Sequence, residues 1–279
     1  MGDITNPPQS SQLQLVLLDL KLKDLQQQSQ LQTAGTYLAT ILYENIYGVY
    51  QKRANLLSGA ARNSAANYFL QLQPPLRVIV SINHAKDFPL VEAFIGQMRR
   101  NHWDFMSQQV GFDVGMNDNL SNITSMWDRL NGATFNIWQG DGLTNCANLV
   151  RGVERLKEAL TIRNNQGHFR KIYYWTADIL YHIRSVLRLG LDAILTNQPQ
   201  RVLQALNEPE FSSKYRLATP YDYPFEQFWI KPSAWKMSLP TVHEAVETVN
   251  NVKKTSADFI KTLPEGIGAA IKKVHSAII

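Results

Sequence analysis

Runs of apolar residues alternate with segments of helical spacing along most of the chain. The first run, residues 13–20, is almost unbroken and ends beside an acid, as is typical of a strand buried on both faces of a sheet. Residues 171–176 have the clearest strand pattern, because β-branched and aromatic side chains fill them. The other predicted strands are residues 77–82, 108–115, 134–138 and 192–197.

Apolar residues at spacings of three and four predict helices between these strands. We expect a helix within residues 30–57, a second that begins at Pro89, and a third that Ser121 caps. Later helices are expected around Leu149, Val153 and Leu156, around Ile183, Val186 and Leu187, and over residues 199–207. Strict alternation of strands and helices predicts an α/β protein with a parallel sheet.

Several predicted strands end in polar or aromatic residues: Asp19, Lys21, Asp113, Gln139, Asp141, Trp175, Asp178 and Asn197. In a (β/α)8 barrel every βα loop opens on the same face, so a barrel explains these strand ends best. We expect Gly140 and Gly142 to turn the backbone sharply at the rim. No GxGxxG motif follows the first strand and no P-loop occurs, which argues against nucleotide-binding α/β folds.

Composition narrows the class of protein. The chain has 279 residues, of which 44% are hydrophobic and 18% charged, as in globular proteins with a substantial core. A net charge of +5 favours anionic lipid or phosphate ligands, with an ordinary basic surface as the alternative. We predict no signal peptide and no transmembrane segment, since no apolar run approaches roughly 20 residues. The single cysteine, Cys146, is a free thiol or pairs with another chain.

Five stretches together resemble one family. The order and spacing of NIWQGDGLTNC, KIYYWTAD, LDAILTNQP and KYRLATPYDYPFEQF are similar to the second half of the sphingomyelinase D, or dermonecrotic toxin, family of arthropod phospholipases D. LVLLDLKLKDL resembles that family's third barrel strand. The resemblance implies an incomplete (β/α)8 TIM barrel, related to glycerophosphodiester phosphodiesterases, with strands 3 to 8 present and the first two missing. Residues 1–12 would be irregular, 13–228 the partial barrel and 229–279 a helical amphipathic tail.

The resemblance also implies site residues and a Mg²⁺ cofactor. Asp19 matches the family's third metal carboxylate and Lys21 its phosphate-contacting lysine. The other matches are to substrate-binding residues, at Tyr173, Trp175, Asp178 and Asn197. The alternatives are a loop acid or cap for Asp19, a solvated charge for Lys21 and core packing for the aromatic residues. Cys146 matches a family cysteine whose partner would lie upstream of Met1, so we expect it to be unpaired.

The family's two catalytic histidines have no counterpart in the sequence. The sequence has six histidines, and none lies in a family catalytic motif. They are His84, His102, His168, His182, His243 and His275. His84 is the one placed near the expected barrel mouth, where a loop histidine with an ordinary partner is the alternative. The loss of each proton-transfer group lowers the reaction rate by roughly 10²–10⁴-fold. We therefore expect a truncated or degenerate relative that is inactive by itself.

Three hypotheses for function follow. The first is a Mg²⁺-dependent phospholipase D that cleaves choline from sphingomyelin or lysophospholipids by intramolecular transphosphatidylation to a cyclic phosphate. The second is a non-catalytic phospholipid-binding relative, and the third is a fragment without function. The expected partners are a phospholipid or sphingolipid and a membrane surface, with no nucleic acid. Secretion is implied by the resemblance. The end of the tail, GIGAAIKKVHSAII, suits an interfacial amphipathic helix or a helix packed on the barrel.

Overall fold

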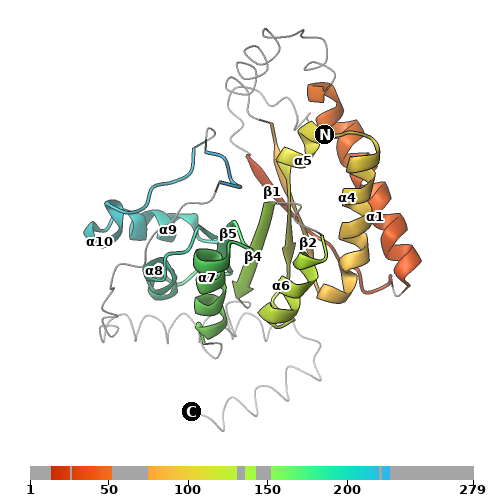
Figure 1. Ribbon diagram of the computed structural model, residues 1–279. Coiled ribbons are helices and arrows are strands. Elements are labelled where there is room, and N and C mark those ends of the chain that lie inside the picture. The colour runs from red at the N-terminus through yellow and green to blue at the C-terminus, as the bar shows by residue number, and fades with distance from the viewer. Residues whose placement is uncertain are drawn as a thin grey trace, which may run out of the picture. The chain divides into compact units, whose positions relative to one another are not determined.

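The computed structural model describes residues 14–25, 27–51, 75–130, 136–142, 152–219 and 222–226. The chain divides into two compact units. Unit 1 comprises Met1–Asp141, Arg155–Ile172 and Leu217–Trp229. Unit 2 comprises Gly142–Glu154, Tyr173–Arg216 and Ile230–Ile279. In the described parts of both units, strands alternate with helices along the chain (Figure 1).

The described strands of unit 1 form a parallel sheet in chain order. They are β1 (Leu15–Asp19), β2 (Arg77–Ile82), β3 (Val110–Val114) and β4 (Asn136–Gly142). Every residue of β2 and β3 is buried, as expected for strands with neighbours on both sides. Asp19 lies opposite Ser81, and Ser81 lies opposite Asp113. These three polar residues therefore form one row near the carboxyl edge of the sheet.

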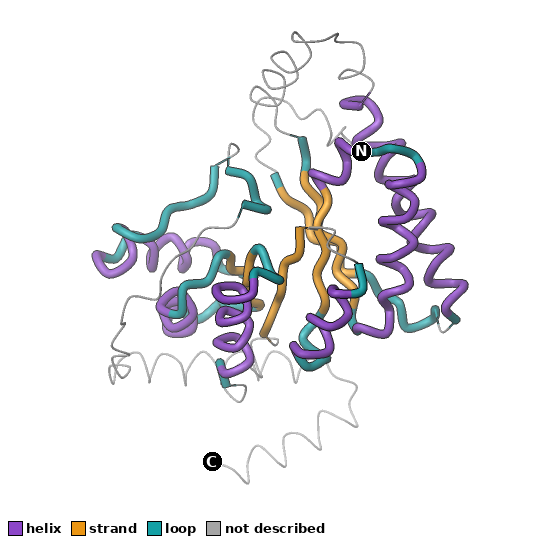
Figure 2. Tube along the Cα trace, viewed as in Figure 1, coloured by secondary structure: helices purple, strands orange, loops and turns teal. Residues whose placement is uncertain are grey.

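Helices of unit 1 follow its strands. They are α1 (Gln28–Leu42), the π-helix η1 (Tyr43–Tyr47), the 3₁₀-helix η2 (Ala85–Asp87), α4 (Phe88–Arg100), α5 (Asp104–Gln109), α6 (Leu120–Asp128) and α7 (Glu154–Gln166). Figure 2 shows α1 and α4 running side by side. Their close approach depends on Gly35, where an added Cβ would lie 2.0 Å from the carbonyl oxygen of Leu90. Helix α4 turns a buried apolar face inward, which includes Phe94 and Met98.

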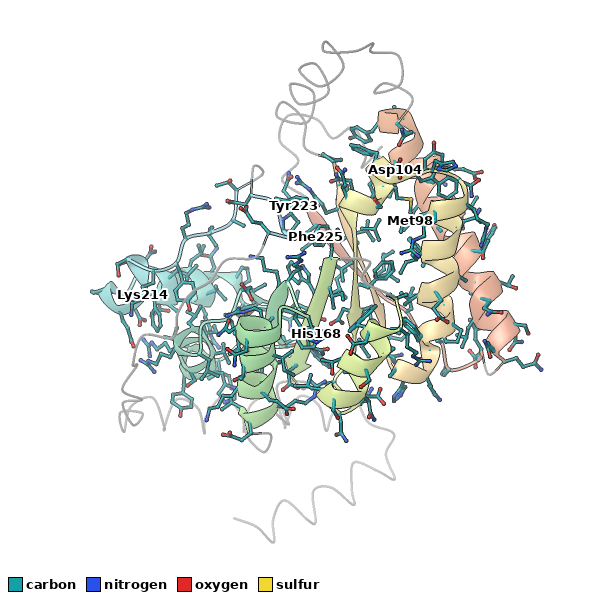
Figure 3. The ribbon with its side chains drawn as sticks, viewed as in Figure 1. Met98, Asp104, His168, Lys214, Tyr223 and Phe225 are labelled. Carbon is teal, nitrogen blue, oxygen red and sulfur yellow. The ribbon has the colours of Figure 1, made fainter. Side chains whose placement is uncertain are left out.

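A short segment, residues 222–226, packs on the amino-terminal side of the unit 1 sheet (Figure 3). The Tyr223 hydroxyl donates to the carbonyl of Gln108 at 2.5 Å. The indole of Trp138 donates to the carbonyl of Pro224 at 3.1 Å. The Phe225 ring covers Gly111, where a Cβ would lie only 2.6 Å from the ring. Glycine in β3 thus makes room for an aromatic side chain that is more than 100 positions later in the sequence.

Unit 2 contains a second, smaller parallel pair of strands. Strand β5 (Lys171–Trp175), whose first two residues belong to unit 1, pairs with the two-residue β6 (Ala193–Ile194). Its helices are α8 (Leu180–Arg188), α9 (Pro199–Leu206) and α10 (Pro209–Ser212). Two ion pairs, each 2.7 Å long, join α8 to the chain around α10: Arg184–Glu208 and Arg188–Glu210.

The predicted α/β class with parallel strands is confirmed, and so are all six predicted strands. Four details were wrong. Gln108 and Gln109, which were predicted within the strand of residues 108–115, lie in α5, and the strand spans Val110–Val114. Asn119, not Ser121, is the N-cap residue of α6. Strand β4 continues through Gly142 instead of ending at Trp138, because Gln139 and Asp141 are buried in hydrogen-bonded positions. Strand β6 spans two residues of the predicted six.

Other predictions concern residues outside the described ranges. Cys146, the helical residue Leu149 and the tail of residues 229–279 all lie there. Within the described ranges, no helix is both long and apolar enough to cross a membrane.

Candidate functional site

Asp19 and Lys21 form an exposed pair at the carboxyl end of β1. The Lys21 ammonium lies 2.5 Å from Asp19 Oδ2, and the two side chains are 70% and 52% exposed, respectively. Lys21 is two residues after Asp19, the last residue of β1, and this separation is short enough for the contact. The pair leaves both groups accessible to a ligand from solution. It also places a positive charge directly beside the carboxylate that the family resemblance assigns to a metal.

Behind this pair, a buried network joins the ends of β2, β3 and β4. The Asp113 carboxylate accepts a hydrogen bond from Ser81 Oγ at 2.7 Å and from the Gly140 N–H at 2.9 Å. The Gln139 amide donates to the carbonyls of Val114 and Gly140. Asp113 and Gln139 are both 0% exposed. These polar residues therefore connect neighbouring strands through buried hydrogen bonds, while the side-chain oxygen of Gln139 is buried without a hydrogen-bond partner.

A second polar chain extends from β4 into the loops of unit 1. Arg155 lies 3.5 Å from Asp141 and donates to the carbonyls of Gly140 and Asp118. The Asp118 carboxylate accepts from the Ala85 N–H at 2.9 Å and lies 3.4 Å from His84 Nδ1. His84 therefore has a carboxylate partner, which agrees with the alternative interpretation of His84 as an ordinary loop histidine.

In unit 2, the structure brings Asp178 and Asn197 together. The Asp178 carboxylate accepts from the Asn197 backbone N–H at 2.7 Å, from its side-chain amide at 3.0 Å and from Thr196 Oγ1 at 2.9 Å. Arg201 donates to the backbone carbonyl of Asp178 at 2.7 Å. This arrangement fixes the loop after β6 against the loop after β5. Because the Asp178 carboxylate already accepts three hydrogen bonds, it orders this loop, and a ligand would have to compete with those donors.

The two predicted aromatic residues differ in accessibility. Tyr173 is 4% exposed, so its ring packs in the core of unit 2. Trp175, at the end of β5, is partly exposed. Gly142 approaches this strand end so closely that an added Cβ would lie 1.5 Å from the Trp175 carbonyl oxygen, and its φ is +143°. The glycine is therefore required at this position for close contact as well as for backbone conformation.

The described histidines and acids do not complete a metal or acid–base site. Within the described residues, no group of three or more His, Cys, Asp or Glu side chains could hold a metal ion. His168 lies 3.7 Å from Asp128, and burial lowers the pKa of the His182 imidazole, which favours its neutral form. Mg²⁺ prefers carboxylate and water oxygens in an octahedral shell. Asp19, paired with a lysine, does not fit that requirement by itself.

Sequence reasoning missed the groups that organise these loops, Ser81, Asp118 and Arg155. Ser81 follows three β-branched residues, so its position near the end of an apolar strand was an available signal. Asp118 and Arg155 had no such signal, because they interact across 37 residues of the chain, between the loop after β3 and the start of α7. Asp19 and Lys21 form one group in unit 1, and Asp178 and Asn197 form another in unit 2; their roles toward a ligand stay predictions.

Comparison with known proteins places the chain in a family. A family model described as dermonecrotic toxin SPH matches residues 2–225. A dermonecrotic toxin of Loxosceles spinulosa, LspiSicTox-betaIE1ii, is 34% identical over 226 residues, which cover 80% of this chain and 73% of that toxin. Dermonecrotic toxin SPH of Ixodes scapularis is 36% identical over 220 residues, or 77% of this chain and 54% of that protein.

Among solved structures, the chain is similar to one from Silicibacter pomeroyi that is described as a glycerophosphoryl diester phosphodiesterase. The identity is 17%, the match covers 55% of each chain and the TM-score is 0.29. The family model, by contrast, extends over most of the sequence, and the toxins are more than 30% identical to it. The chain belongs to the dermonecrotic toxin SPH family.

Proposed function

We propose that this chain carries the lipid-binding part of a phospholipase D-type function of the sphingomyelinase D kind, directed at the phosphodiester of choline-bearing lipids. The substrates would be sphingomyelin or lysophospholipids, and the reaction an intramolecular transphosphatidylation. In that reaction a hydroxyl of the lipid attacks its own phosphorus, the bond to choline oxygen breaks, and a cyclic phosphate and choline result. The products balance without water or an oxidant.

One observation supports this proposal beyond family membership. Asp19 and Lys21 lie exposed at the carboxyl end of a parallel strand. This is the strand end at which barrel enzymes gather their reactive groups. A lysine ammonium at such a position suits a lipid phosphate, because it supplies up to three charge-assisted hydrogen bonds. We accordingly propose that the parallel strands belong to a (β/α)8-type barrel and that the protein acts at a membrane surface after secretion.

Magnesium dependence is part of the proposal. A bound Mg²⁺ would supply charge stabilisation at the phosphate oxygens. Asp19 is the described carboxylate that would contact it, and Lys21 already occupies one of its oxygens. Mg²⁺ commonly takes one or two carboxylates together with substrate phosphate oxygens. We therefore expect that any Mg²⁺ binding by this chain requires the lipid phosphate.

We propose that this chain by itself binds the lipid headgroup without turning it over. In the described part of the chain, His84 and His168 lie beside Asp118 and Asp128, and burial lowers the pKa of His182, which favours its neutral form. None of these occupies a catalytic motif of the family. A non-catalytic phospholipid-binding protein is thus the second candidate, supported by the Lys21 side chain, which is 70% exposed.

Choline release and lipid binding together test both candidates. The purified chain is incubated with sphingomyelin or lysophosphatidylcholine, with and without Mg²⁺, and choline is measured. We expect no Mg²⁺-dependent release, but retention of the chain on sphingomyelin vesicles. Lys21→Ala should weaken retention several-fold, whereas Lys214→Ala, which removes the same charge from unit 2, should not (Figure 3). Metal-dependent choline release would contradict the proposal that this chain only binds, and retention insensitive to Lys21 would contradict its phosphate role.

A further inference from the structure

A buried arginine lies at the amino-terminal edge of the unit 1 sheet. Arg77 is the first residue of β2 and is 7% exposed. Its Nε and Nη1 atoms are buried and have no hydrogen-bond partner. Asp19 and Ser81 lie opposite each other near the carboxyl ends of β1 and β2. The guanidinium of Arg77 is therefore a feature separate from the candidate site, at the other edge of the sheet.

Two tyrosines lie near this guanidinium, and neither supplies a negative charge. The guanidinium carbon of Arg77 lies 5.9 Å from the centroid of the Tyr223 ring, which the segment of residues 222–226 brings to this edge of the sheet. Tyr47, in the π-helix η1, is 0% exposed and also interacts electrostatically with Arg77. Burial raises the pKa of both tyrosine hydroxyls, so both are protonated and neutral at physiological pH.

Hydrogen bonds already engage both tyrosine hydroxyls. Tyr47 donates to the Leu76 carbonyl at 3.0 Å, and Tyr223 donates to the Gln108 carbonyl at 2.5 Å. Among the described residues, no carboxylate forms an ion pair with the arginine. The side-chain oxygen of Gln109 is buried without a partner, but a neutral amide cannot balance a charge. The positive charge of the arginine therefore has no counterion among the described side chains.

The burial of Arg77 is costly as long as its charge stays unbalanced. A buried cation loses its hydration, and here it gains no ionic partner from the described residues in return. Burial accordingly lowers the pKa of the Arg77 guanidinium below its ordinary value. Because arginine nevertheless stays protonated in proteins, its free N–H groups favour an acceptor that carries negative charge. An ion from solution can supply that charge.

We propose that Arg77 binds a monovalent anion of the chloride class at the amino-terminal edge of the sheet. One guanidinium balances one negative charge, whereas a sulfate or phosphate dianion would leave a net negative charge buried. A tetrahedral oxyanion also needs several donors, and the protons of both tyrosine hydroxyls are already bonded to carbonyls. A single-atom anion needs only the guanidinium N–H groups. This site goes beyond the proposed phospholipase D-type function and does not depend on it.

Urea unfolding of the intact chain in sodium chloride tests the site, with sodium gluconate added to keep the ionic strength constant. Chloride that binds only the folded chain lowers the unfolding equilibrium constant, by about tenfold at a tenfold excess over its dissociation constant. Bromide should act like chloride, because it has the same charge and a similar size. Broadening of the chloride NMR line by the folded chain, reversed by bromide, measures the binding directly.

Two substitutions of arginine separate this site from general effects of salt. Arg77→Leu removes the guanidinium, so we expect the chloride dependence of unfolding and the line broadening to disappear. Arg100→Leu is the matched control, since it removes one exposed arginine from α4 in the same unit and should keep both effects. Where Arg77→Leu does not fold, Tyr223→Ala is the second variant. It exposes the guanidinium to water, and the chloride effect should fall severalfold.

Three results would overturn the proposal. A chloride effect of the same size in Arg77→Leu, or in Tyr223→Ala where that variant is used, would be a general effect of salt. Equal stability in chloride and gluconate, without line broadening, would mean that water alone serves the Arg77 donors. Sulfate that acts through Arg77 more strongly than chloride would assign the site to an oxyanion. Lipid retention and choline release are measured separately, so failure of the proposed function stays distinguishable.

Discussion

The two units use aspartate at the end of a strand in different ways. In unit 1, Asp113 is 0% exposed and holds Ser81 of the neighbouring strand and the Gly140 backbone. In unit 2, Asp178 is partly exposed and holds Thr196 and Asn197 in the loop after β6. The first carboxylate joins strands in the core, and the second shapes a loop at the surface. A polar residue at a strand end is thus a site residue only where its burial and its partners leave it open to a ligand.

The largest effect is expected at Gly142, the first residue of unit 2. Its φ of +143° and the 1.5 Å approach to the Trp175 carbonyl exclude a side chain. We expect Gly142→Ala to lower the free energy of unfolding by about 3–5 kcal/mol, the sum of backbone strain and a displaced strand end. Urea unfolding monitored by circular dichroism measures this loss.

Gly190 is a matched control in the same unit. Its φ is also positive, at +85°, but no atom lies within 4 Å of a Cβ placed there. Gly190→Ala should therefore show the backbone term alone, about 1–2 kcal/mol. Similar losses at the two glycines would mean that the contact with Trp175 contributes nothing.

The next prediction compares the effects of replacing Asp113 and Asp178. Asp113→Ala leaves the Ser81 hydroxyl and the Gly140 N–H without this acceptor in the core, so we expect a loss of about 2–4 kcal/mol. In Asp178→Ala, water replaces the carboxylate as the acceptor for its former donors. We therefore expect the free energy of unfolding to fall by only about 1 kcal/mol. Urea midpoints and slopes of the two variants give both values. A larger loss for Asp178 would reverse the assignment of core and loop roles.

The sequence predicted the strands better than the partners of their polar ends. Apolar runs such as residues 77–82 are buried on both faces, so local pattern alone determined them. Strand β4 was predicted too short, because Gln-Gly-Asp-Gly has the composition of a turn. Distant groups contact its buried polar side chains: the Val114 carbonyl accepts from the Gln139 amide, and Arg155 lies beside Asp141. Such long-range pairing leaves no local signal.

The same limit applies to the candidate site. The resemblance to the family singled out Asp19 with Lys21, and Asp178 with Asn197, and the structure places each pair in contact. It did not reveal that Tyr173 is enclosed in the core, since an aromatic residue in a strand has the same pattern whether it packs inside or lines a pocket. A cavity of about 340 Å³ beside Lys86 and Asp87 was also missed, because segments that follow three different strands, β1, β2 and β3, build it.

The smallest effect is expected at a surface ion pair of unit 2, Arg188–Glu210, which contrasts with the buried Asp113 network of unit 1. The hydrogen bond from Arg188 lowers the pKa of the Glu210 carboxyl below its ordinary value of 4.5. A carboxyl whose folded pKa is lowered stabilises the fold above its unfolded pKa and loses that contribution as the pH falls through the folded value. Stability from this pair should thus be present above about pH 4.5 and decline below it.

The size of this contribution follows from exposure. The Glu210 side chain is 41% exposed, so solvent screens the pair, and we expect only a few tenths of a kcal/mol. The difference in unfolding free energy between the unmodified protein and Glu210→Gln, measured from pH 6 to pH 3, isolates the term from other titrating groups. That difference should shrink toward low pH and vanish in the Arg188→Met background. A difference that stays constant with pH would assign the effect of Glu210→Gln to packing, and Arg188 would then hold α8 to α10 through its contact with the Phe211 ring instead.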